Sequence, residues 1–465
     1  MKIHLIRLIP AMSLILSACV TDPSGINAES PSLVSPQKWK ENASQQLQII
    51  NRTWWRDFSD PMMSAAITKA LSHNLDLAVA ETRVREAAAL SKEARSLLFP
   101  EFDLAGGGEQ VRRLTDLGIT DETREAQPQF QVSYEVDLWG RIRSGNKAAM
   151  ASEKASVYAR DAMQLSVAAA TARNYITLTS LDAQLKIVQD TLKIRQDSLT
   201  LMRRRAVTGY SSELDVTRAQ AEYEAVAQQE QSLALAVQRQ ENAVRFLTGD
   251  LPGTVPRSSI NIISLPTLSP GLPSSLLNRR PDIAQAESLL IAADASLAAS
   301  KANLLPQVQL SASVGRLFVE GFSPINVWSV GGSVLAPLFD GDRRLAQVEA
   351  STAQRERAVL AYRRVVLNAF SETENALSGV SRFNSEYEHL SAQVTALKDA
   401  YGRASRLYDN GYASYIDKLN SQRQLLGTEL TWVKVQEERL NNGISLYQVL
   451  GGGWTPDNRN RKVVQ

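Results

Sequence analysis

The stretch QPQFQVSYEVDLWGRIRSG, residues 127–145, joins two patterns that seldom meet in one segment. Polar and apolar side chains alternate across its first half, with the apolar ones at Phe130, Val132, Tyr134, Val136 and Leu138. This alternation predicts a strand with one face in an apolar environment and the other in water. Beyond Trp139 the chain is free of proline until Pro252 and shows helical spacing. A strand of membrane-spanning length therefore opens directly into a very long helical segment.

The composition excludes several classes of protein. The chain has 465 residues, with 51 basic and 49 acidic side chains and a net charge of +2. No basic arm and no aromatic RNA-binding motif interrupts this balance, so we expect no nucleic-acid partner. No apolar run reaches the ~18 residues of a transmembrane helix.

The N-terminus has the pattern of an export signal. Lys2 and Arg7 precede a short apolar run that ends in LSAC, whose last residue is Cys19. This sequence resembles the lipobox of bacterial lipoproteins, which implies a covalent lipid on Cys19. By the same resemblance, Val20 in place of Asp implies delivery to the outer membrane. An ordinary secretory peptide is the alternative, but Cys19 is the only cysteine in the chain. We expect no other cofactor and no disulfide.

The sequence contains the same unit twice. VTGYSSELD at 207–215 resembles DNGYASYID at 409–417, SLLFPEFDL matches ANLLPQVQL, and DLWGR matches PLFDGDR. This repeat predicts six divisions: a signal peptide at 1–18, a lipidated extended segment at 19–53, a first repeat at 54–250, a linker at 251–271, a second repeat at 272–452 and a tail at 453–465.

Each repeat carries the same parts in the same order. An alanine-rich helix ends at a proline, Pro100 or Pro306. Two strands of about ten residues follow, a length that crosses a bilayer when the strand is tilted. They are expected at 102–113 and 128–138, and at 307–318 and 326–336. A soluble edge strand would alternate in the same way, but four segments of matching length favour membrane strands.

Long helices complete each repeat. One stripe with 3-4 apolar spacing runs from Leu178 to Met202 and includes Arg195. A second stripe runs beside it at Ile187, Ile194 and Leu201. Such spacing predicts heptad packing, and the second stripe indicates helices with partners on two sides, as in a ring. A simple two-stranded coiled coil is the alternative. At 1.5 Å per residue the longest helices would reach ~100 Å.

Short turns are expected between the paired helices, at TGYSSELD and NGYASYID. Gly209 and Gly411 suit the left-handed position that ends a helix. Each glycine is followed by the Ser-x-x-Asp spacing of an N-terminal cap, at Ser212–Asp215 and Ser414–Asp417. Each repeat should therefore hold a helical hairpin closed by a tight turn.

Four membrane strands cannot close a barrel alone, because the smallest bacterial barrels have about eight. Open strand edges are not tolerated in lipid, so the strands predict a homo-oligomer with cyclic symmetry. The expected fold class is mainly α with a membrane β-barrel, in which one wall passes from barrel strands into a ring of periplasmic helices. Trp139 would then lie at the membrane boundary, with an ordinary packed tryptophan as the alternative.

The stretch LLNRRPDIAQAESLLIAADASLAASKANLLPQVQLSASVG, residues 276–315, resembles the signature of the TolC-like outer-membrane efflux protein family. The most specific positions are Arg279, Arg280, Pro281 and Asp282. WWRDFSDPMM, DLWGR and LFDGDRR also match, and with the lipobox they resemble the nodulation-T type lipoprotein branch. The resemblance implies a trimer anchored in outer-membrane lipid, with a 12-stranded barrel and a 12-helix periplasmic tunnel. It also implies a periplasmic adaptor protein and an inner-membrane pump, usually a proton-driven drug exporter.

The resemblance further implies where such a channel is gated. In the family, a leucine and an aspartate near the second hairpin turn commonly close the tunnel. Matching GYASYIDKLNSQ to that pattern implies a gate at Ile416 and Asn420. Asn420 departs from the family because it carries no charge. Asp417 is a second candidate, although it lies about 100° round the helix from its neighbour.

The hairpin turns are the candidate contacts for the adaptor, with a solvated loop as the competing interpretation. These residues are Gly209, Tyr210, Ser211, Gly411, Tyr412 and Ala413.

Nothing in the sequence predicts catalysis or a metal site. His73 and His389 are isolated, and the glycine runs GGGEQ and GGGW lack the helix and the Lys-Ser/Thr of a phosphate loop. We therefore expect a passive efflux channel for drugs or other small molecules. Two alternatives remain open: the exit duct of a type I protein secretion system, and a coiled-coil surface lipoprotein without a channel. The exported compounds cannot be predicted from these features.

Overall fold

The computed structural model describes residues 36, 38–41, 50–114, 116 and 118–456. The predicted signal peptide and Cys19 lie outside these residues. The chain divides into two compact units. Of the described residues, unit 1 comprises those in Val84–Ser156 and Ala286–Arg363, and unit 2 comprises those up to Arg83, those in Val157–Gln285 and those from Arg364 onward.

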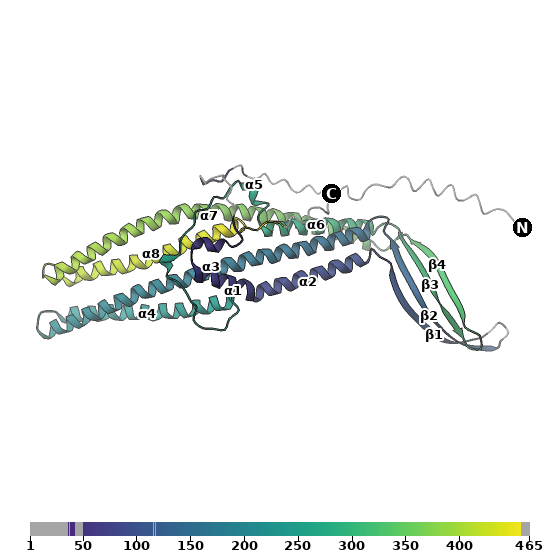
Figure 1. The fold of residues 1–465 in the computed structure, drawn as a ribbon, viewed down its shortest axis with the longest axis horizontal. Helices are drawn as coiled ribbons and strands as arrows, with labels where there is room; N and C mark the ends of the chain where they lie inside the picture. The colour runs from purple at the N-terminus through teal and green to yellow at the C-terminus, as the bar shows by residue number, and fades with distance from the viewer. Residues whose placement is uncertain (1–35, 37, 42–49, 115, 117, 457–465) are drawn as a thin grey trace. The chain divides into compact units, whose positions relative to one another are not determined.

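Unit 1 contains the four predicted strands in a single antiparallel sheet, in the order β1-β2-β3-β4 (Figure 1). The strands are β1 (Glu101–Leu114), β2 (Thr120–Val136), β3 (Gln307–Val319) and β4 (Ile325–Leu335). Three of them lie within one or two residues of the expected bounds. The fourth, β2, begins at Thr120 rather than at residue 128. The expected start was too late because the alternation of polar and apolar residues does not extend into TDETREAQ. Pairing with β1 carries this segment into the sheet.

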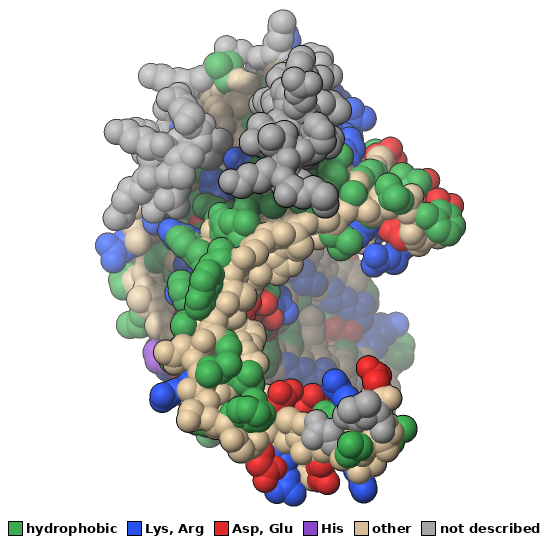
Figure 2. All heavy atoms as spheres, turned by 90° about the vertical axis from the view of Figure 1, so that its right-hand side faces the viewer, with side chains coloured by type: hydrophobic (Ala, Val, Ile, Leu, Met, Phe, Trp, Pro, Cys, Tyr) green, Lys and Arg blue, Asp and Glu red, His purple; other side chains and the backbone are tan. Residues whose placement is uncertain are grey.

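The strand register places all even-numbered strand residues on one face of the sheet. Phe102 pairs with Val132, which pairs with Ala312, which in turn pairs with Val330. Most side chains on this face are apolar and exposed, including Phe102, Leu104, Phe130, Val314, Trp328 and Val334. Figure 2 shows hydrophobic side chains along the strands and charged ones around the β1–β2 turn. The odd-numbered face is richer in Gln, Ser and acidic residues, with apolar residues such as Val111, Leu317 and Ile325 among them.

A capped junction turns the strand β2 into the helix α3 (Arg141–Val207). The carboxylate of Asp137 accepts hydrogen bonds from the backbone N–H groups of Ile142 (3.1 Å) and Arg143 (2.8 Å). Gly140 adopts the left-handed conformation, with φ of 74°. The half-buried Trp139 donates its indole N–H to the carbonyl of Pro306 (2.7 Å), so it packs against the second repeat at this junction.

The other elements of the described residues are helices. The long pairs are α3 with α4 (Glu213–Leu247) and α7 (Arg343–Asp409) with α8 (Tyr415–Val449). Helices α3 and α7 have 67 residues each, while α4 and α8 have 35 each, as a duplicated unit requires. The shorter helices are η1 (Trp54–Phe58), α1 (Pro61–His73), α2 (Leu75–Ser96), η2 (Ile260–Ile262), α5 (Pro273–Leu276) and α6 (Pro281–Ala302). No helix within the described residues is long and apolar enough to cross a membrane.

The main core of unit 2 explains the WWRDFSDPMM segment. Trp54 stacks on Tyr447 of α8, with ring centroids 5.1 Å apart, and the Tyr447 hydroxyl donates to Asp57 (2.7 Å). The Tyr175 hydroxyl of α3 donates to the buried carboxylate of Asp60 (3.0 Å), which also caps α1. Burial raises the pKa of Tyr175 to about 12. These contacts join α3 and α8 through residues 54–60.

Candidate functional site

The two hairpin turns have the same backbone geometry. In the first, Gly209 has φ of 75° and the N–H of Tyr210 donates to the carbonyl of Arg205 (2.8 Å). In the second, Gly411 has φ of 81° and the N–H of Tyr412 donates to the carbonyl of Leu407 (2.8 Å). A left-handed glycine with this bond satisfies the last carbonyls of a helix. The predicted left-handed glycines are therefore confirmed.

The helices that follow the turns are capped as predicted. The side chains of Ser212 and Ser414 accept hydrogen bonds from the backbone N–H of the aspartate three residues on. At the second turn Asp417 also accepts from the backbone N–H of Ser414 (3.2 Å), which completes a capping box. The Asp417 carboxylate is thus engaged in the cap of its own helix.

Two aromatic side chains lie exposed at the turns. Tyr210 is 86% exposed and Tyr412 is 82% exposed, and Val207 beside the first turn is exposed as well. The backbone of each turn is fixed by its cap and its glycine, so these side chains are presented on a rigid support. Apolar and aromatic groups presented in this way are typical of a protein contact surface. Ser211 and Ala413 lie half-buried beside them.

The gate candidates share one exposed face of α8. Ile416 is 37% exposed and Asn420, one turn further on, is exposed, whereas Leu419 between them is buried. Leu419 therefore packs within the chain, while Ile416 and Asn420 project from it.

A network of charges joins the two hairpins near their turns. Glu222 of α4 accepts from Arg423 of α8 and forms an ion pair with Arg195 of α3, at 3.4 Å. Arg195 is only 2% exposed, and its burial lowers the pKa of the guanidinium. The hydrogen bond from Arg423 lowers the pKa of Glu222. One carboxylate thus neutralises charges from two other helices, including a fully buried one.

A second contact lies closer to the turns. Tyr408 of α7 accepts a hydrogen bond from Arg205 of α3 (2.8 Å), and Lys418 lies 5.1 Å from the centre of its ring. The ring of Tyr415 packs against it, with centroids 5.8 Å apart. The apolar stripe of the sequence contained Arg195, but the partners of Arg195 and Tyr408 come from other helices, so the two contacts were not predicted.

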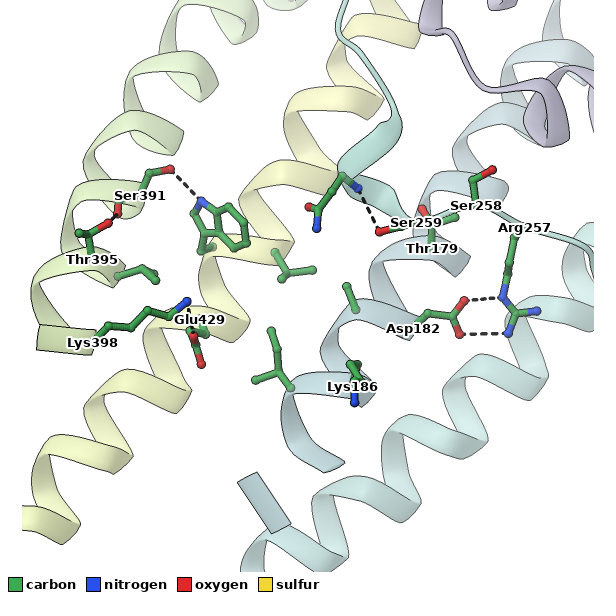
Figure 3. Close-up of a pocket in the computed structure, with 16 residues that line it drawn as sticks. Thr179, Asp182, Lys186, Arg257, Ser258, Ser259, Ser391, Thr395, Lys398 and Glu429 are labelled. Atoms are coloured by element: carbon green, nitrogen blue, oxygen red, sulfur yellow. Dashed lines mark hydrogen bonds and ion pairs between the residues drawn. The ribbon is translucent and has the colours of Figure 1, made fainter. Parts of the chain in front are cut away.

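A cavity of about 690 Å³ separates the hairpins between this charge network and the main core of unit 2 (Figure 3). Its lining includes two ion pairs, Arg257 with Asp182 and Lys398 with Glu429 (3.0 Å). In both pairs the two charges neutralise one another. No cluster of three potential metal ligands occurs among the described residues.

The signature residues tie three helices together rather than forming a site. Arg280, which is buried, donates to Asp282 (2.8 Å) and Glu372 of α7 (2.8 Å). Pro281 begins α6. Gly451, just after the end of α8, packs against the backbone of Arg279. An added Cβ at Gly451 would lie 2.0 Å from the carbonyl oxygen of Arg279. The motif therefore fixes where α6 begins against the ends of its neighbours.

Comparison with known proteins gives the class to which this architecture belongs. The family model described as outer membrane efflux protein matches residues 66–250 and 272–452. The chain is 30% identical to the pyoverdine export outer membrane protein OpmQ of Pseudomonas putida, over 97% of this chain and 98% of OpmQ. It is also 30% identical to the solvent efflux pump outer membrane protein SrpC of Pseudomonas putida, over 86% of this chain and 87% of SrpC.

A solved structure agrees with the sequence comparison. The outer-membrane channel OprN superposes with a TM-score of 0.86 at 27% identity, covering 92% of this chain and 98% of OprN. The chain belongs to the outer membrane efflux protein family. It is an outer-membrane channel of efflux pumps with a large periplasmic helical part, and it is not an enzyme.

Proposed function

We propose that three copies of this chain close one barrel and one helical tunnel, through which small molecules leave the cell. The observation that carries the proposal is the sheet itself. Its strands β1 and β4 are edges, each with one side unpaired within the chain, while one face is apolar. Open edges beside an apolar face are unsupported in lipid, and neighbouring copies supply the missing strands.

The second apolar stripe of α3 supports the same assembly. Ile194 is 40% exposed and Leu201 is 37% exposed, although both continue a heptad spacing. Within one chain nothing covers these side chains fully. Helices of a neighbouring copy would bury them and extend the wall of the tunnel, as the sequence stripe indicates.

The gate would lie at Ile416 and Asn420. Their shared exposed face, beside the turn of the second hairpin, supports a pair of side-chain rings around the three-fold axis. An Asn ring carries no charge, so the constriction would be sterically narrow but electrically neutral. Asp417 contributes less, because its carboxylate is held in the capping box.

The turns Gly209–Ser211 and Gly411–Ala413 would contact a periplasmic adaptor, which links the channel to an inner-membrane transporter, proton-driven in our proposal. Their exposed tyrosines on rigid caps support this. A lipid on Cys19 would anchor each chain, since acyl chains contribute about 0.8 kcal/mol per buried methylene. The substrates would be small molecules, and solvents and pyoverdine are what two relatives are named for.

Photo-crosslinking in living cells tests the placement of the turns. A photoreactive amino acid replaces Tyr412, and the captured protein is identified by mass spectrometry. We expect an adaptor belonging to a proton-driven exporter. The matched control replaces Leu75, which is 71% exposed but lies far from the turns in sequence, at the start of α2, and should capture no adaptor.

The other outcomes are decisive. An adaptor from an ABC-type system would reassign the channel to protein secretion. Equal capture from both positions, or no periplasmic partner from Tyr412 in well-expressed protein, would contradict the turn as the docking surface.

A further inference from the structure

The even-numbered face of the sheet is wholly apolar nearest the helices and becomes mixed toward the hairpin turns, where the Arg316 row is followed by Gly108, Ala126 and Phe318 and then by Gln110 and Arg124. Over the part nearest the helices, every side chain on this face is apolar or glycine, and the last of these rows contains Leu104, Phe130, Val314 and Trp328. The next row toward the hairpin turns contains Gly106, Pro128, Arg316 and Asn326. This transition has the form of a boundary between hydrocarbon and headgroups.

Arginines lie on this face at and beyond the boundary. We call Arg112, Arg124 and Arg316 the outer arginines; all three are exposed. Within the described part of the chain, the side chains of Arg112 and Arg316 form no hydrogen bond or ion pair. Arg124 lies 3.8 Å from Glu320, with both side chains about 60% exposed, so this pair contributes little.

The acidic groups on the same face do not neutralise the outer arginines. Glu122 accepts a hydrogen bond from the side-chain amide of Gln110. Glu320 is already the weak partner of Arg124. Gly106 and Pro128 lie in the same row as Arg316 and are small. The guanidinium of Arg316 is therefore accessible on the even-numbered face. The side chain of Arg316, at the edge of the apolar part of this face, is therefore available to bind an anionic partner.

The position of the boundary identifies that partner. In unit 1 the helices join one end of the strands and the hairpin turns lie at the other. Since the helical part is periplasmic, the turns lie at the outer surface of the membrane. A guanidinium binds phosphate through two parallel hydrogen bonds, and its aliphatic stem can lie along apolar neighbours such as Val314 and Phe318.

We propose that the outer arginines bind the phosphate groups of an anionic lipid in the outer leaflet, with Arg316 as the principal contact. The proposal rests on the strands crossing the membrane, as the proposed function requires. Arg316 would hold the phosphate nearest the hydrocarbon, while Arg124 lies two rows further out on the same face and Arg112 one row beyond Arg124. Charge complementarity at the headgroup level favours lipid over protein as the occupant.

Arg113 provides a matched control within the same strand. Like its neighbour Arg112, Arg113 is exposed and has no ion-pair partner among the described residues. Strand alternation, however, places Arg113 on the odd-numbered face, which would line the channel. Replacing either arginine removes the same charge, but only one of the two changes would remove a lipid contact.

The test measures lipid bound to the full-length, lipidated protein. Oligomers in phosphatidylcholine nanodiscs are titrated with lipid A, a glycolipid with two phosphates, and bound lipid is counted by native mass spectrometry. We expect Arg316→Gln to weaken binding about tenfold, the loss of a charge-assisted contact. The triple change that also includes R112Q and R124Q should abolish it, while R113Q should bind as the wild type does.

Three outcomes would overturn the proposal. Arg316→Gln could bind lipid A as tightly as the wild type, or R113Q could lose as much as R316Q, which would indicate a general charge effect. Displacement of lipid A by equimolar inorganic phosphate would indicate a site for free anions. Insertion is checked separately by heat-modifiable mobility of the oligomer. A wild-type protein that fails this check would contradict the proposed function instead.

Discussion

At the scale of single residues, the charge network near the hairpin turns has the greatest consequence for mechanism. Glu222 is the one acidic partner of two arginines from different helices, and one of these is buried. Arg195 could be noticed in the sequence because it interrupts an apolar stripe. Its partner Glu222, and the second arginine that Glu222 binds, Arg423, could not be predicted, since this arrangement depends on how two hairpins far apart in the chain pack together.

Replacing Glu222 by Gln should loosen the contact between the hairpins. The change leaves Arg195 buried without a counter-charge, which costs about 3 kcal/mol. We expect faster hydrogen exchange in the first turns of α8, measured by mass spectrometry. Glu224→Gln, an exposed change on the same helix, is the control and should leave exchange unaltered. Identical exchange in both variants would mean that the network does not hold the hairpins together.

Tyr175 in the main core of unit 2 should make the stability of the protein depend on pH in the alkaline range. The folded-state pKa of Tyr175 is raised to about 12, above the value of about 10 for an unfolded chain. Its stabilising effect is therefore complete below about pH 10 and is lost as the pH rises toward 12. Thermal unfolding followed by circular dichroism should show a fall in Tm over this window that is smaller in Tyr175→Phe. An equal fall in both proteins would contradict this role.

At the scale of elements, the sheet depends on one close approach between two strands. Pro128 lies in the inner strand β2, where it can donate no hydrogen bond to the ladder. Opposite the next residue, Gln129, an added Cβ at Gly315 would lie 2.4 Å from the Pro128 carbonyl oxygen and 2.5 Å from the Gln129 Cβ. Only glycine fits there without moving the strands.

Gly315→Ala should therefore destabilise the strand unit, by about 1–3 kcal/mol for overpacking of this kind. The readout is the temperature at which the oligomer dissociates during electrophoresis. Gly331→Ala in β4 is the control, because its Cβ would meet only Ser311 Oγ, at 3.9 Å. Equal dissociation temperatures for the two variants would show that the sheet accommodates a Cβ at Gly315 without loss of stability, which would contradict this prediction.

The elements were more predictable than their contacts. The alternation in FQVSYEVDL and the heptad stripes each report a local periodicity, so strands, hairpins and caps follow from the sequence alone. The early start of β2 at Thr120 does not, because pairing with β1, rather than its own pattern, holds that segment. Trp139 was open to two interpretations; its hydrogen bond to Pro306 shows a packing contact, while its place at the membrane boundary stays a prediction.

At the scale of the whole molecule, the duplicated plan explains why the chain is incomplete alone. Two strands and one hairpin per repeat give a sheet with two open edges and helices with exposed apolar stripes. The short motifs typical of the family have local structural roles. Arg280, for example, forms hydrogen bonds to Asp282 of α6 and to Glu372 of α7. How copies of the chain meet is encoded in surfaces that sequence periodicity only partly reveals.

The measurement that tests the central claim most directly is single-channel conductance of the purified protein in planar bilayers, for the wild type and for Ile416→Gly. The account predicts discrete conductance steps for both proteins, with larger steps for Ile416→Gly, because the smaller side chain widens the proposed constriction. Inserted protein that gives no steps in either form would contradict the assignment of this chain as a channel.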